Sequence, residues 1–206
     1  MQNKNSITKM VLELVLQVAL VVMAVAIVVI DAETIEHGRS EYSITEFTHS
    51  FFILVSALLF GLTAIYNSHE RGFLLLVMGL FITMLIREND AFLDAIQHGF
   101  WVYPAVVATL VSIFCARKCT GTVKQAMLAY MESKKFAYIT LGLVIIVVFS
   151  RTFGSGNLWR EVMGDDYSTL YKSVIQEGIE LLGYTFVLYG SILVWFKAFR
   201  GKSLNK

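Results

Sequence analysis

Three stretches of the sequence place acidic and histidine side chains three or four residues apart. Glu46 and His49 stand three apart in EFTH, and Asp94 and His98 stand four apart in DAFLDAIQH, where Asp90 lies four residues earlier. Residues at these spacings share one face of an α-helix. Each stretch therefore presents its polar groups together if it is helical.

The third stretch is EGIELLGY, in which Glu177, Glu180 and Tyr184 step by three and then by four. Glu180 falls within the apolar run IELLGYTFVLY. An ionisable side chain at membrane depth is costly and is a functional candidate for that reason.

We predict that these stretches converge on a divalent-metal site. A Glu-x-x-His pair on one helix, with carboxylates from other helices, is how helical bundles build di-iron and di-manganese sites. Mixed imidazole and carboxylate ligands also suit zinc. The expected ion is zinc, iron or manganese. The predicted ligands are Glu46, His49, Asp94, His98, Glu177 and Glu180.

The elements that must position these groups are transmembrane helices. Of the 206 residues, 56% are hydrophobic and 16% are charged, whereas soluble domains have about 25% charged residues. Six apolar blocks account for the excess, and they predict an all-α, polytopic bundle that forms one transmembrane domain over residues 1–206. The blocks are 10–30, 47–66, 72–87, 98–116, 135–150 and 174–198.

Two of the six blocks are short for a span, which needs about 20 residues. The third and fifth blocks reach that length only if Arg87 and Lys135 extend to the interface. If both blocks are instead buried or re-entrant, the chain has four spans.

Charge placement sets the orientation. With the N-terminus in the cytoplasm, twelve of the 17 lysines and arginines fall on the cytoplasmic side, including those at both termini. Thirteen of the 16 acids and three histidines, His37, His49 and His98, fall outside. We therefore expect a multi-pass protein of the bacterial inner membrane whose polar site faces the periplasm.

Ordinary helix capping is a competing interpretation of the outer acids. The second, fourth and sixth blocks all begin on the outer side, and carboxylates stabilise helix N-termini by about 0.3–1 kcal/mol each. Glu46, Asp94 and Glu177 fit that role. Capping does not account for His49 and His98, or for a second acid at Glu180.

The favoured function is a metal-dependent membrane enzyme whose small-molecule or lipid substrate arrives from the outer side. A cation or proton carrier with an acidic mouth is one alternative, and a non-catalytic subunit whose acids are only caps is another. The sequence has no basic run and no glycine-rich phosphate loop, so neither a nucleotide nor nucleic acid is expected as a ligand.

Overall fold

The computed structural model describes residues 2–36, 43–119 and 121–203. These residues form helices joined by short connections, and no strand occurs among them, which confirms the predicted all-α class. His37 lies outside the described residues. Four helical segments are long and apolar enough to cross a membrane, namely Met10–Glu33, Ile44–Tyr66, Lys134–Phe153 and Thr169–Phe199.

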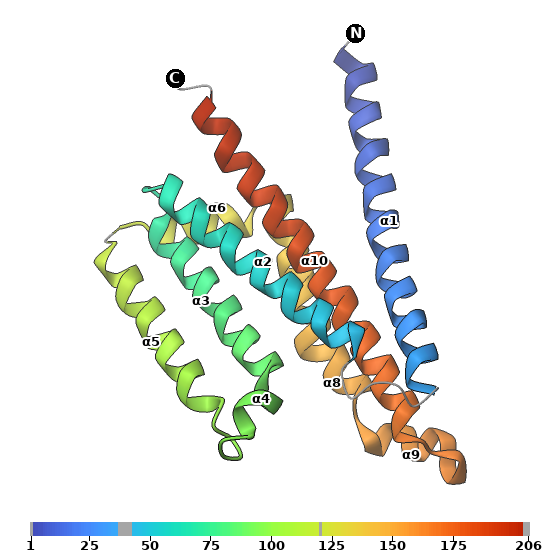
Figure 1. Cartoon of the computed structure of the whole chain (residues 1–206). Helices are drawn as coiled ribbons and strands as arrows, with labels where there is room; N and C mark the ends of the chain where they lie inside the picture. The colour runs from blue at the N-terminus through green and yellow to red at the C-terminus, as the bar shows by residue number, and fades with distance from the viewer. Residues whose placement is uncertain (1, 37–42, 120, 204–206) are drawn as a thin grey trace.

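The long helices run side by side, with both chain termini at one end of the molecule (Figure 1). They are α1 (Gln2–Glu36), α2 (Ile44–Tyr66), α3 (Arg71–Glu88), α5 (Val102–Lys118) and α10 (Thr169–Ser203). A sixth rod joins α7 (Lys134–Val144), the π-helical turn η1 (Ile145–Phe149) and α8 (Ser150–Phe153). The short elements are α4 (Asp90–Asp94), α6 (Lys124–Met131), α9 (Gly156–Met163) and the 3-10 turn η2 (Gly164–Asp166).

Five of the six predicted apolar blocks lie within one of these rods, and the block 98–116 begins four residues before α5. Two of the rods do not meet the length or the low charge expected of a span. Helix α3 carries Arg71, Arg87 and Glu88 among its 18 residues, and α5 has 17 residues. Whether α3 and α5 cross the membrane therefore stays a prediction.

The core is formed mainly by α2, α3, α7 and α10. Phe60 of α2 meets Phe81 of α3 edge to face, with 5.4 Å between ring centroids. Both rings are fully buried, as is Leu181 of α10. Burial of large apolar side chains between helices holds α2 and α10 at the centre of the bundle.

Helix α7 approaches α10 closely at two glycines. A Cβ atom on Gly142 would lie 2.5 Å from the carbonyl oxygen of Gly183, so no other residue fits at Gly142 without a shift. Small residues at helix contacts allow this close approach in membranes. As a result, Ser150, which follows the π turn of the same rod, reaches the side chains of α10.

Helix α1 contacts the bundle mainly near its C-terminal end, where Ala24 and Asp31 are buried. The Asp31 carboxylate accepts hydrogen bonds from the backbone N–H groups of Ile44 and Thr45 at 2.9 and 3.2 Å, and one from the Ser43 hydroxyl. An acid on one helix thus caps the N-terminus of the next. The apolar side chains along the rest of α1, such as Leu12, are exposed.

Candidate metal site

An acidic cavity of about 180 Å³ lies at the end of the bundle opposite the chain termini, where α2 begins and α3 ends (Figure 1). Helix α10 forms its third wall. The lining residues are Glu46, His49, Arg87, Glu88, Asp90, Ser173, Gln176, Glu177 and Glu180.

Three of these residues come close enough to share one metal ion. One potential ligand atom each from His49 of α2, Glu88 of α3 and Glu180 of α10 lies within 4.8 Å of the other two. His49 is 1% exposed and Glu180 is 9% exposed. Two consecutive helices, α2 and α3, and the distant α10 therefore supply a nitrogen and two carboxylates to one point.

The tautomer of His49 follows from its contact with α10. Its Nε2 atom lies 3.1 Å from the backbone carbonyl oxygen of Glu177. A carbonyl oxygen only accepts, so Nε2 carries a hydrogen, and in the neutral imidazole Nδ1 keeps its lone pair. Metal-binding histidines usually donate their other ring N–H to an acceptor of this kind, which orients the ring.

Glu180 is held by two donors. The Ser150 hydroxyl and the Gln176 side-chain amide both donate to its Oε1 atom, the latter at 3.3 Å. Because both bonds go to the same oxygen, Oε2 is the atom available to a ligand. Ser150 is fully buried, so its hydroxyl is a fixed partner rather than a surface contact.

Glu88 is the last residue of α3, beyond the apolar stretch 72–87. Burial raises the pKa of its carboxyl group above the ordinary value, and the nearby negative charge of Glu180 raises this pKa further. The guanidinium of Arg87 lies 3.6 Å from the Glu88 carboxylate, and its positive charge opposes this rise in pKa. The ionised form of Glu88 is therefore disfavoured until a cation or a proton neutralises the cluster.

Tyr184 adds a buried hydroxyl beside the three ligands. The side chain is 0% exposed, and its ring centroid lies 5.3 Å from that of His49. The hydroxyl is close enough to Glu88 and Glu180 to interact with their charges. Among the described residues it has no hydrogen-bond partner of ordinary geometry. A buried hydroxyl without a partner is costly, and a bound ligand would satisfy it.

The charges that line the acidic cavity do not balance. Among the described residues, five carboxylates and the guanidinium of Arg87 line the cavity, and Arg151 acts on Glu88 from outside that lining. Carboxylates crowded in a partly buried site repel one another, so they must share protons or a cation. A divalent ion at the three converging ligands fits this charge distribution.

The structure gathers four of the six residues predicted as ligands. Glu46, His49, Glu177 and Glu180 all line the acidic cavity. Asp94 and His98 do not belong to that lining. Their role as ligands stays a prediction with no support from their position.

The reason is a break in the expected helix. The spacing in DAFLDAIQH predicts one helical face that leads into the fourth block, but α4 ends at Asp94 and α5 begins only at Val102. Gly99 turns the chain with φ of +80° and donates its N–H to Asp94 at 3.0 Å. The His98 side chain is fully exposed and pairs with Asp94 at 3.4 Å.

Helix capping, the competing interpretation of the outer acids, does not account for the acids of the cavity. Helix α10 begins at Thr169 rather than near 174, so Glu177 and Glu180 lie in its interior. At the start of α2, Ser43 and Asp31 accept from the free N–H groups. The carboxylates of Glu46, Glu177 and Glu180 are therefore not needed as N-caps.

Sequence reasoning missed Glu88 and Ser150. Glu88 was visible as an acid at the outer end of an apolar block, directly after Arg87. No other acid, histidine or cysteine stands three or four residues from Glu88, so no helical motif singled it out. Ser150 carries no sequence signal for this role, since only the packing of α7 on α10 brings it to Glu180.

Comparison with protein-family models, curated proteins and solved structures finds no match. The geometry of the site alone therefore carries the functional argument.

Proposed function

We propose that this chain is an integral membrane protein with an outward-facing divalent-metal site, and that it acts as a metal-dependent membrane enzyme. The observation that carries the proposal is the convergence of His49, Glu88 and Glu180 within 4.8 Å, from three different helices. Three protein ligands with room for a further one are the arrangement of catalytic rather than structural metal sites.

The ligand atoms that we assign are Nδ1 of His49, Oε2 of Glu180 and a carboxylate oxygen of Glu88. One nitrogen with two carboxylates suits zinc, manganese or iron(II). When bound, such an ion would activate a water molecule for attack on the substrate. Ser150 and Gln176 would keep Glu180 oriented, as hydrogen-bonded partners of metal ligands do.

Other cavity residues provide proton-transfer and binding groups. Glu46 and Glu177 line the same cavity beside the three ligands, where a carboxylate can take a proton from a reacting group and return it. Arg87 is the cation that the described part of the lining supplies, and it suits an anionic group of the substrate. We propose a small molecule or a lipid from the outer side as the substrate.

The proposed setting is a bundle of six spans in a bacterial inner membrane, with both termini in the cytoplasm. Support comes from the distribution of lysine and arginine, and from the position of both termini at the end opposite the acidic cavity (Figure 1). In this arrangement the acidic cavity faces the periplasm.

A cation or proton carrier is the second candidate, and the excess of carboxylates in the acidic cavity favours it. Conduction would need polar groups through the bundle. Between the cavity and the other end, the described core of α2, α3 and α10 is built from side chains such as Phe60, Phe81 and Val187. This apolar layer favours the enzyme over the carrier.

Metal analysis of the detergent-purified protein tests the proposal. After incubation with zinc, manganese or iron(II) and removal of free ion, we expect about one ion per wild-type chain, the number that three ligands at one point imply. Glu180→Gln and His49→Ala should each weaken binding at least tenfold. The matched control is His98→Ala, because this histidine is fully exposed and outside the acidic cavity. Absence of bound metal in the wild type, or equal losses in His98→Ala and Glu180→Gln, would overturn the proposal.

A further inference from the structure

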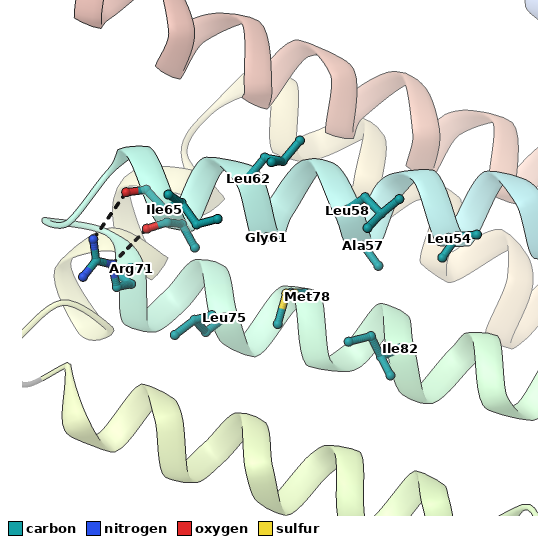
Figure 2. A pocket seen from close by; sticks show the side chains of 11 residues that line it. Leu54, Ala57, Leu58, Gly61, Leu62, Ile65, Arg71, Leu75, Met78 and Ile82 are labelled. Atoms are coloured by element: carbon teal, nitrogen blue, oxygen red, sulfur yellow. Dashed lines mark hydrogen bonds between the residues drawn. The ribbon is translucent and has the colours of Figure 1, made fainter.

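A second, apolar cavity of about 570 Å³ lies between α2 and α3, in the half of the bundle nearer the chain termini. We call it the α2–α3 groove. Figure 2 shows Leu75, Met78 and Ile82 of α3 in a row that faces the side chains of α2. The α2 side chains Leu58 and Leu62 are 57% and 42% exposed, so the groove is open to the surroundings of the protein.

Small residues on α2 create the hollow. Ala57 and Gly61 line the α2–α3 groove between the larger leucines. A Cβ atom on Gly61 would lie 3.0 Å from the sulfur of Met78, which shows how closely the two helices approach there. The small residues therefore leave a hollow between the larger side chains at a point where α2 and α3 pack closely.

Arg71 closes one end of the α2–α3 groove (Figure 2). Its Nε atom donates to the carbonyl oxygen of Ala64 at 2.9 Å, and Nη2 donates to that of Ile65 at 3.4 Å. Both acceptors are carbonyl groups in the last turn of α2, so they hold the guanidinium in place and offer it only the partial negative charge of a helix C-terminus. No ion pair joins it to a carboxylate among the described residues.

The basic character of this end extends beyond Arg71. The N–H of Gly72 donates to the hydroxyl oxygen of Thr122 at 2.9 Å, which ties the start of α3 to the turn between α5 and α6. Lys118 ends α5 and Lys124 begins α6 on the two sides of that turn. An anionic group at Arg71 would therefore have two further cations at the same end of the bundle. The nearby carboxylate of Glu70 is already engaged by Asn67 and Tyr130.

The length of the α2–α3 groove matches one leaflet. From Leu54 to Ile65 the helix advances by about 17 Å, at about 1.5 Å per residue. Half of the roughly 30 Å hydrocarbon core of a bilayer is about 15 Å. A chain that starts at Arg71 and follows the groove would end near the bilayer midplane.

We infer that the α2–α3 groove binds an anionic glycerophospholipid from the leaflet on the side of the chain termini. One acyl chain lies along Leu58 and Leu62, and the phosphate lies against the guanidinium of Arg71. Arginine matches phosphate through paired N–H donors, and the walls of the groove match hydrocarbon. The inference requires that α2 crosses the membrane, and it is independent of the proposed metal site.

Photo-crosslinking of the wild-type protein is the first test. The probe is a phosphatidylglycerol with a diazirine in one acyl chain, incorporated into nanodiscs with unlabelled phosphatidylcholine. We expect adducts concentrated on Leu54–Ile65 and Arg71–Ile82, and displaced by excess unlabelled phosphatidylglycerol. Equal labelling of exposed apolar positions on α5, such as Leu110 and Phe114, would overturn the inference.

Charge variants provide the second test. Native mass spectrometry should show that Arg71→Gln lowers retention of phosphatidylglycerol at least tenfold, whereas Arg71→Lys keeps part of it. The control is Arg117→Gln, which removes one exposed positive charge at the same end of the bundle. Equal losses in Arg71→Gln and Arg117→Gln, or equal retention of phosphatidylcholine by the wild type, would contradict a specific phosphate site. Metal content should stay unchanged in every variant, which separates this result from the test of the metal site.

Discussion

The Nε2 atom of His49 lies 3.1 Å from the carbonyl oxygen of Glu177, and this contact connects the first turns of α2 to the interior of α10. Because the carbonyl fixes the hydrogen on Nε2, it leaves Nδ1 of a 1%-exposed imidazole without a proton. The same contact therefore joins two helices and prepares a metal ligand. The variants below separate these structural and chemical roles.

Tyr184→Phe should stabilise the metal-free protein. The buried hydroxyl has no hydrogen bond of ordinary geometry, and its remaining polar contact is with the Glu88 carboxylate. Removing a poorly satisfied buried polar group relieves at most the penalty of about 1–3 kcal/mol for an unsatisfied one. Thermal unfolding in detergent measures the effect. With metal bound we expect the gain to shrink or reverse, since the hydroxyl would then reach a bound water.

Tyr130→Phe is the matched control for that experiment. The Tyr130 hydroxyl is also buried but donates to a carboxylate oxygen of Glu70 at 2.9 Å. Loss of a hydrogen bond to a charged group should cost about 1.5–3 kcal/mol, with or without metal. If both phenylalanine variants lose stability equally, Tyr184 has a partner after all.

Ser150→Ala should weaken metal binding without removing a ligand. Its hydroxyl donates to Glu180 from a fully buried position, and loss of such a supporting group typically costs about 10–100-fold in metal affinity. Titration of the metal-free protein with zinc or manganese provides the measurement.

Ser191→Ala controls for the loss of a buried serine. Ser191 is equally buried on α10, but its hydroxyl donates to the carbonyl oxygen of Val187 in its own helix at 2.7 Å. Metal affinity should match the wild type in this variant. A similar loss of metal affinity in both serine variants would show that the affinity depends on the packing around α10 and not on the orientation of Glu180.

Glu88→Gln should change how stability depends on pH in the metal-free protein. Burial and the charge of Glu180 raise the pKa of Glu88 above its ordinary 4.5. A raised carboxyl pKa stabilises the folded state fully at low pH, and this contribution is lost as the pH rises through the folded-state pKa. The stability of the wild type should therefore fall as the pH rises from the ordinary pKa of Glu88 through its raised folded-state pKa. In Glu88→Gln, stability should depend less on pH over the same interval.

The readout for Glu88 is a series of melting temperatures measured from below pH 4.5 to neutral pH after chelation. With metal present, the melting temperature of the wild type should instead rise with pH, because protons compete with the ion for the same carboxylates. A wild-type curve as flat as that of Glu88→Gln would show that the carboxyl group titrates normally.

Reporter fusions should test the six-span arrangement. Fusions after Ser68 and Gly121 are expected on the cytoplasmic side, and fusions after Gln97 and Tyr167 on the periplasmic side. Alkaline phosphatase is active only outside and green fluorescent protein only inside, so the two reporters give opposite patterns. The same location for the Ser68 and Gln97 fusions would show that α3 does not cross, and would leave the four apolar helices as spans.

Much of the bundle was predictable from local sequence. Five of the six apolar blocks lie within helical rods and the block 98–116 does so from Val102 on. A helix satisfies its backbone hydrogen bonds within one segment, and the apolar composition marks that segment. Boundaries were less predictable at polar ends. The start of α5 at Val102 depends on the turn at Gly99, and the start of α10 at Thr169 precedes its apolar stretch.

The candidate site was predictable in part. Helical spacing singled out Glu46 with His49 and Glu177 with Glu180, since both pairs lie in unbroken helices. The same reasoning failed to place Asp94 and His98, because it assumed one helix where the chain turns. Glu88 stood out only as an acid at the end of an apolar block, and Ser150 had no local signal.

By itself, the sequence determined the all-α class, the apolar helices and the gathering of acids toward one set of helix ends, because composition and spacing act within a single segment. Only the tertiary structure decided which acids meet. His49, Glu88 and Glu180 converge within 4.8 Å because α2, α3 and α10 pack around shared buried side chains. The rotation of each helix about its axis is set by that packing, and no helix encodes the rotation of its neighbours.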